Sequence, residues 1–124
     1  MRLLLDTHVF LWWSEDDPRL RADARQAIEE ADQVLVSAAS AWEVTIKAAL
    51  GKLEIAIPFA EAVEVNRFGE LPVTFAHAAA VTELPPHHGD PFDRMLVAQA
   101  QTEGLTLVTH DRRLEPYSVH VLWT

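Results

Sequence analysis

The chain has 124 residues, of which 49% are hydrophobic, and its formal net charge is -9 at pH 7. This composition excludes a disordered or fibrous chain, and the length fits one globular domain, so we expect residues 1–124 to form a single domain. The absence of cysteine excludes disulfide bonds and thiolate metal sites.

No stretch of the sequence indicates a membrane protein or a secreted one. The apolar runs fall short of the roughly 20 residues that a membrane span requires. Near the start of the chain, Asp6 and His8 interrupt the apolar run that a secretory signal would need. We therefore expect a protein that does not associate with membranes and that resides in the cytoplasm.

The first predicted element is a buried strand. Residues 3–5 are all leucine, and this apolar run stops at Asp6 and Thr7, a pattern typical of a strand inside a parallel sheet. A short helix is expected over residues 7–13. A longer helix is expected over residues 19–30, where apolar residues recur every three or four positions.

A second strand and a third helix come next. Residues 34–36 form the strand, and the helix is expected over residues 39–50, where Gly51 ends it. We expect the apolar face of this helix to contain Ala39, Trp42, Ile46 and Ala49. Glu43 stands at the edge of that face, from which it could reach the strand ends. Alternatively, Glu43 forms a surface ion pair with Lys47, worth about 0.2–0.5 kcal/mol.

The middle of the chain carries structural signals but no catalytic ones. Pro58 opens a helix that we expect to reach residue 68, followed by a strand over residues 71–73 and a helix over residues 75–84. The apolar side chains at the start of this stretch serve either the core or a subunit contact: Ile55, Ile57, Phe59, Val63 and Phe68.

Residues 87–100 carry the most specific local signal in the sequence, which is the start of a helix with two acids. Asp90 and Pro91 fit the N-cap and the first position of a helix, which places Asp93 in the first turn. Both carboxylates would also complement the helix dipole there. We favour that stabilising role for Asp90 and metal binding for Asp93.

Three histidines near this segment are weaker candidates. His87 and His88 could act as an acid-base pair or as transition-metal ligands, because imidazole titrates near neutral pH. They lie in a run rich in proline and glycine, however, so we expect a solvated loop. His110, between Thr109 and Asp111, either approaches the site or faces outward at the end of the strand, and we do not assign it to the site.

The last predicted strand covers residues 105–109 and breaks at Asp111. Asp6 and Asp111 therefore both follow strands, and in open α/β sheets ligands gather at that edge. The alternative is that each acid only caps the helix that follows it.

Four carboxylates are thus expected to converge. At 4 Å and an effective dielectric constant near 20, each pair would repel by about 4 kcal/mol, so the cluster requires cations or protons. Oxygen ligands in this number favour Mg²⁺ or Mn²⁺, which can bridge a phosphodiester to an acidic protein. Three basic residues are predicted either to contact the phosphates of a nucleic acid or to be ordinary solvated surface: Lys47, Arg94 and Arg112.

Four motifs in order carry a resemblance to a known family. They are Leu-Leu-Leu-Asp-Thr at residues 3–7, Ser-Ala-Trp-Glu at 40–43, Asp-Pro-Phe-Asp-Arg at 90–94 and Leu-Val-Thr-His-Asp at 107–111. Together they resemble the PIN domain, and more narrowly the VapC-type ribonuclease toxins of toxin-antitoxin pairs. The resemblance implies an α/β fold with three α/β/α layers and a central parallel sheet of four or five strands.

The same resemblance implies a site and a set of partners. Catalysis and metal binding map onto Asp6, Glu43, Asp93 and Asp111. Our mechanistic hypothesis is that Asp6 and Asp93 hold one or two metal ions most directly, that Glu43 completes the site or orients water, and that Asp111 supports the metal. Thr109 and Thr7 are implied as supporting hydroxyls, and Asp90 as a further acid without an assigned role. The implied partners are an RNA substrate, a small VapB-type antitoxin and a second copy of the chain in a homodimer.

Two other functions remain open from the sequence. A receiver-like signalling module also gathers carboxylates and Mg²⁺ at strand ends, but it would show paired acids after the first strand, where this chain has Asp6 followed by Thr7. A non-catalytic RNA-binding domain would gain nothing from repelling carboxylates. Three tryptophans would suit a protein partner if they add to an exposed apolar surface, but for each one alone we favour a position in the core: Trp12, Trp13 and Trp123.

Overall fold

The computed structural model describes residues 1–124 as five strands, six α-helices and one short 3-10 helix. In chain order the elements are β1 (Arg2–Leu5), α1 (Thr7–Ser14), α2 (Ala22–Glu30), β2 (Gln33–Ser37), α3 (Ala38–Ala49), α4 (Phe59–Val65), β3 (Gly69–Leu71), α5 (Phe75–Thr82), α6 (Pro91–Glu103), β4 (Thr106–Thr109), η1 (Arg112–Leu114) and β5 (Val121–Trp123). None of the helices combines the length and the apolar character that crossing a bilayer requires.

The five strands form one parallel sheet in the order β3-β2-β1-β4-β5. From β1 the chain builds outward through β2 and β3, and it then returns to the other side of β1 for β4 and β5. The strand order therefore reverses between β1 and β4, and in such sheets ligands bind beside the carboxyl ends of the strands at this switch point. The predicted parallel sheet of four or five strands is confirmed.

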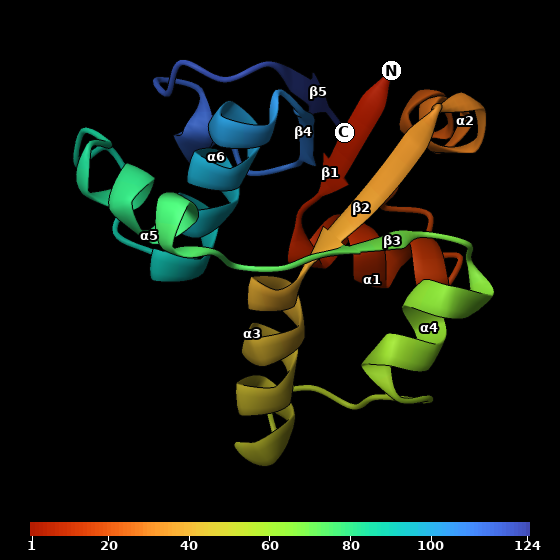
Figure 1. Cartoon of the computed structure of the whole chain (residues 1–124). Coiled ribbons are helices and arrows are strands. Elements are labelled where there is room, and N and C mark those ends of the chain that lie inside the picture. The colour runs from red at the N-terminus through yellow and green to blue at the C-terminus, as the bar shows by residue number, and fades with distance from the viewer.

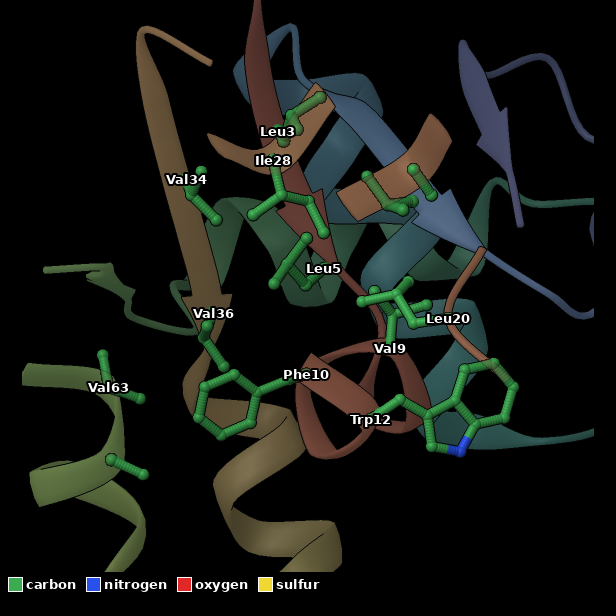
Figure 2. Close-up of a cluster of buried hydrophobic side chains, with 13 residues drawn as sticks. Leu3, Leu5, Val9, Phe10, Trp12, Leu20, Ile28, Val34, Val36 and Val63 are labelled. Carbon is green, nitrogen blue, oxygen red and sulfur yellow. The ribbon is translucent and has the colours of Figure 1, made fainter. Parts of the chain in front are cut away.

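Helices cover both faces of the sheet, as three layers require. Along β1, Leu3 and Leu5 join the core cluster shared with α1, α2 and α4, whereas Leu4 joins the cluster shared with α6. Figure 1 shows α5 and α6 on one side of the strands, and α2 and α4 on the other. In Figure 2, Phe10 of α1 lies near Val36 of β2 and Val63 of α4. The expected three-layer fold is confirmed.

Several element boundaries differ from the prediction. The helix expected from residue 19 begins only at Ala22, because the Asp17 carboxylate accepts the Arg19 amide and holds a turn there. The helix expected to reach residue 68 ends at Val65, before Arg67 adopts a φ of 60°. The expected strand at 71–73 lies at Gly69–Leu71.

The core position that we favoured for each single tryptophan is observed for Trp12 and Trp13. Trp12 is buried in the core cluster, and Trp13 packs against that cluster. Trp123 is half-buried and its ring lies 4.3 Å from the Arg112 guanidinium carbon. Other large apolar side chains do lie on the surface: Met1, Trp42, Ile46, Leu50, Ile55, Ile57, Val65, Val73 and Phe75.

Gly104 ends α6 in the left-handed conformation, with φ 68° and ψ 40°, and its amide donates to the Ala100 carbonyl. A side chain in this conformation costs roughly 1–2 kcal/mol. We therefore expect Gly104→Ala to lower the free energy of unfolding by about 1–2 kcal/mol, measured by urea denaturation. The matched control is Gly89→Ala, because Gly89 has no positive φ and nothing within 4 Å of an added Cβ. Equal unfolding midpoints for the two variants would refute the assignment of this cap.

Candidate functional site

Asp6 directly follows β1 at the switch point of the sheet. Its Oδ1 accepts the Val9 amide at 2.8 Å, so it caps α1, as the alternative interpretation expected. Its Oδ2 accepts the Thr109 hydroxyl at 2.5 Å, which ties the end of β1 to the end of β4. A carboxylate has about four lone-pair positions, so these two hydrogen bonds leave room for a further ligand.

The electrostatic surroundings of Asp6 are unusual for a structural carboxylate. Its exposed fraction is 4%, and burial raises the pKa of its carboxyl above the ordinary value, partly offset by the hydrogen bonds from Thr109 and Val9. No lysine or arginine forms an ion pair with it. A buried carboxylate without a cationic partner favours either a bound proton or a bound cation.

Glu43 reaches the same edge from α3 and is also 4% exposed. Its Oε1 accepts the Thr7 hydroxyl at 2.6 Å, and Thr7 follows Asp6 in the chain. Its Oε2 lies 2.7 Å from the Lys47 ammonium nitrogen, so the predicted ion pair with Lys47 is present. Both alternatives for Glu43 are therefore observed together: it pairs with Lys47, and it faces the strand ends.

The predicted apolar face of α3 is confirmed for Ala39 and wrong for Trp42, Ile46 and Ala49, which are exposed. The buried side chains of this helix are Ala39, Ser40, Glu43 and Val44. Trp42 is 65% exposed instead, and its ring meets the Phe92 ring edge-on at 5.6 Å between centroids. The helix buries a small and polar face because it packs beside α1 and α6, where Thr7 and Glu43 hydrogen-bond.

Asp93 lies in the first turn of α6, as predicted. Burial raises the pKa of its carboxyl to about 6, with further repulsion from Asp90 and from Asp6, and a hydrogen bond from His88 opposes the shift. Asp90 is the N-cap of the helix, and its Oδ1 accepts the Phe92 amide at 2.8 Å and the Asp93 amide at 3.2 Å. The capping role that we favoured for Asp90 is therefore observed.

Asp111 follows β4 and is held by Arg113. The Arg113 guanidinium donates to both carboxylate oxygens, at 2.9 and 2.8 Å, and these bonds hold the pKa of Asp111 below its ordinary value. The Asp111 amide donates to the Thr109 hydroxyl oxygen at 3.1 Å. Because the same hydroxyl donates to Asp6, Thr109 connects two of the four predicted acids.

The side chain of His88 is buried at the site, so the prediction of a solvated loop is wrong for this residue. Its side chain is only 7% exposed, and its Nε2 lies 2.9 Å from an Asp93 oxygen and 3.3 Å from an Asp111 oxygen. The expectation of a solvated loop holds for His87, which is exposed. The sequence carried no local signal for this position, because the loop is held by the Tyr117 hydroxyl far along the chain.

The three basic residues predicted to contact RNA have different surroundings in the structure. The Arg94 guanidinium donates to the carbonyls of Pro85, Val81 and Leu84 and to the Tyr117 hydroxyl, so it fastens the loop before α6. These bonds occupy the group inside the protein, and we withdraw Arg94 as a phosphate contact. Lys47 pairs with Glu43 at the edge of the site. Lys47 and Arg112 stay predictions.

Comparisons with known proteins identify the family of the chain. A family model described as PIN domain matches residues 3–118. The chain is 40% identical to Ribonuclease VapC22 of Mycobacterium tuberculosis over 120 residues, which cover 93% of this chain and 91% of that protein.

Solved structures with the same fold are more distant in sequence. VapBC2 from Rickettsia felis, bound to a DNA fragment from its promoter, matches with a TM-score of 0.74 at 13% identity, covering 98% of both chains. FitAcB from Neisseria gonorrhoeae matches with a TM-score of 0.69 at 20% identity, covering 97% of this chain and 96% of that one. At these identities the likeness establishes the fold alone.

Proposed function

The chain belongs to the PIN domain family, and from this premise we propose that it is a metal-dependent endoribonuclease, the toxin of a toxin-antitoxin pair. The identity of 40% to Ribonuclease VapC22 over most of both chains supports the activity. The observation that supports the site most strongly is Asp6, a buried carboxylate at the switch point of the sheet with a raised pKa and no ion pair to a lysine or arginine.

The side chains at this edge fit a divalent cation. Carboxylate oxygens are the ligands that Mg²⁺ and Mn²⁺ prefer, and Asp6 and Asp93 both have raised pKa values because burial penalises their charge. A cation would remove that penalty. We assign the metal site, as the sequence suggested, to Asp6, Glu43, Asp93 and Asp111.

When bound, the cation supplies positive charge that activates a water molecule and neutralises the phosphoryl group. The side chains of the chain orient the reaction. The Val9 amide and the Thr109 hydroxyl fix both oxygens of Asp6, while Thr7 and Lys47 fix those of Glu43. Such fixed partners hold carboxylates in place before substrate arrives, which lowers the cost of reorganisation during the reaction.

Partners follow from the same proposal. The acidic chain, with a net charge of -9, requires the cation and nearby basic groups to accept RNA. Lys47 and Arg112 are the proposed phosphate contacts. A VapB-type antitoxin and a second copy of the chain are the proposed protein partners in the cytoplasm, and the exposed apolar side chains of Trp42 and Phe75 fit protein contacts.

Thr109 is a supporting residue for which we predict the effect of substitution on metal binding. It is fully buried, donates to Asp6 and accepts from the Asp111 amide. We expect Thr109→Val to preserve the side-chain volume but to lower metal affinity by about 10–100-fold, the usual effect of removing a group that orients a metal ligand. Calorimetric titration with Mn²⁺ measures this affinity. The control is Thr82→Val, because the exposed Thr82 hydroxyl donates only to the Ala79 carbonyl within α5. Wild-type affinity in Thr109→Val would argue against this role.

The proposal is tested with a pool of structured RNAs. The purified chain is incubated with Mg²⁺, with Mn²⁺ or with EDTA, beside the double variant Asp6→Asn/Asp93→Asn. We expect internal cleavage that requires metal and disappears in the variant. Cleavage that persists in EDTA, or in the double variant, would contradict the proposed site. Metal binding and RNA binding without any cleavage would favour a non-catalytic RNA-binding domain.

A further inference from the structure

His88 forms a compact cluster with two of the predicted acids. One ligand atom each from His88, Asp93 and Asp111 lies within 4.8 Å of the other two. The three residues come from different parts of the site: the loop before α6, the first turn of α6 and the segment after β4. This convergence is a feature of the tertiary fold and cannot be explained by the local cap of one helix.

The loop that carries His88 is held in place by specific contacts. The His88 amide donates to the Tyr117 hydroxyl at 3.1 Å, and the same hydroxyl accepts from Arg94 at 3.1 Å. Arg94 in turn binds carbonyls of the preceding loop. These contacts aim the imidazole at the carboxylates and keep its side chain 7% exposed.

The ring atom that faces the carboxylates is Nε2, at 2.9 Å from Asp93 Oδ2 and 3.3 Å from Asp111 Oδ2. An imidazole nitrogen in this position can offer a proton to the two oxygens, or it can offer its lone pair to a cation bound between them. In the first role it is a substitute for the cation, and in the second it is a ligand. Both roles place His88 in the metal site.

We propose that His88 is a metal ligand in this site, together with Asp93 and Asp111, and that its nitrogen makes the site prefer Mn²⁺ over Mg²⁺. This inference rests on the proposed function, which it deepens by assigning a nitrogen ligand to a site otherwise built from oxygen. Mg²⁺ takes oxygen ligands in near-ideal octahedral geometry and gives up its waters reluctantly. Mn²⁺ shares the preference of Mg²⁺ for oxygen ligands, but as a first-row transition ion it accepts an imidazole nitrogen more readily, so a site with one nitrogen ligand discriminates between the two ions.

The test compares His88→Ala and His88→Gln with the matched control His87→Ala. His87 is the adjacent imidazole, it is exposed, and its ring lies 5.2 Å from the Tyr117 ring, outside the cluster. Mn²⁺ and Mg²⁺ are titrated separately into the metal-free full chain by calorimetry. Circular dichroism shows whether each variant is folded, and His88→Gln keeps a polar side chain on the loop if His88→Ala unfolds.

We expect loss of His88 to weaken Mn²⁺ binding at least roughly tenfold, the lower bound for removing a group that only supports a metal ligand, and to change Mg²⁺ binding much less. Pulsed electron paramagnetic resonance of bound Mn²⁺ should show coupling to an imidazole nitrogen in the wild type and in His87→Ala, and none in the His88 variants. Unchanged Mn²⁺ affinity in His88→Ala, or no nitrogen coupling in the wild type, would overturn the inference.

These readouts are separate from the test of the nuclease. If RNA cleavage requires metal but the His88 variants bind Mn²⁺ as the wild type does, only the role of His88 fails. If the nitrogen coupling is present but no RNA is cut, the proposed function fails and the metal site stands.

Discussion

Asp6→Asn is expected to lower the rate of RNA cleavage by more than about 100-fold, because even residues that only support a metal ligand contribute 10–100-fold. Asparagine has nearly the same shape as aspartate and is an equally good N-cap, so α1 should keep its start. The substitution removes the negative charge that would hold the cation at the switch point of the sheet. The measurement is single-turnover cleavage with saturating enzyme in Mn²⁺.

The matched control for this variant is Asp23→Asn. Asp23 is an exposed carboxylate in the first turn of α2, with a side chain that is 69% exposed. We expect the Asp23→Asn variant to cleave RNA as fast as the wild type does. The Asp6→Asn variant should keep the circular dichroism spectrum and the RNA binding of the wild type, so that the loss of cleavage concerns the chemical step. An unchanged rate in Asp6→Asn, or an equal loss in Asp23→Asn, would be incompatible with the assignment.

The metal-free protein is expected to lose stability as the pH rises from about 4 to about 6. The pKa of Asp93 rises from 3.8 to about 6 on folding, and that of Asp6 is also raised. The folded state therefore binds more protons than the unfolded state in this interval, and the free energy of unfolding falls as those protons leave. One pKa unit corresponds to about 1.4 kcal/mol, so the loss is on the order of 2–3 kcal/mol.

Urea denaturation in EDTA at pH 5, 6 and 7 measures this loss. Asp93→Asn cannot ionise, so its unfolding free energy should change much less over the same interval and should exceed that of the wild type at pH 7. Mn²⁺ should restore the stability of the wild type at pH 7, because a ligand that binds only the folded state stabilises it. The lowered pKa of Asp111 acts below this interval, where stability falls with acid. A wild type that is more stable at pH 7 than at pH 5 in EDTA would contradict the account.

Much of the fold follows from local sequence patterns. The run of leucines in β1 and the cap of α6 at Asp90 are strong signals, since each has few structural alternatives. The strand β5 (Val121–Trp123) was not identified individually, because three residues at the edge of a sheet leave almost no periodic signal. Its place is fixed by pairing with β4, which the sequence does not reveal.

The sequence indicated where the acids that follow strands would lie, but it did not indicate which face of α3 would be buried. Asp6 and Asp111 stand at strand ends, which a parallel sheet brings to one edge. Glu43 is buried and Trp42 is exposed, whereas apolar side chains are usually the buried ones, because the inner face of α3 lines a polar site. His88 needed the tertiary position of its loop, which depends on the Tyr117 hydroxyl far along the chain.

The most direct test measures Mn²⁺ binding and RNA cleavage over the same range of Mn²⁺ concentrations, in the wild type and in Asp6→Asn/Asp93→Asn. We predict that binding and cleavage half-saturate at the same concentration in the wild type and that both are lost in the variant. Cleavage that proceeds at full rate while the site is empty, or that survives in the double variant, would show that these carboxylates do not form the catalytic metal site.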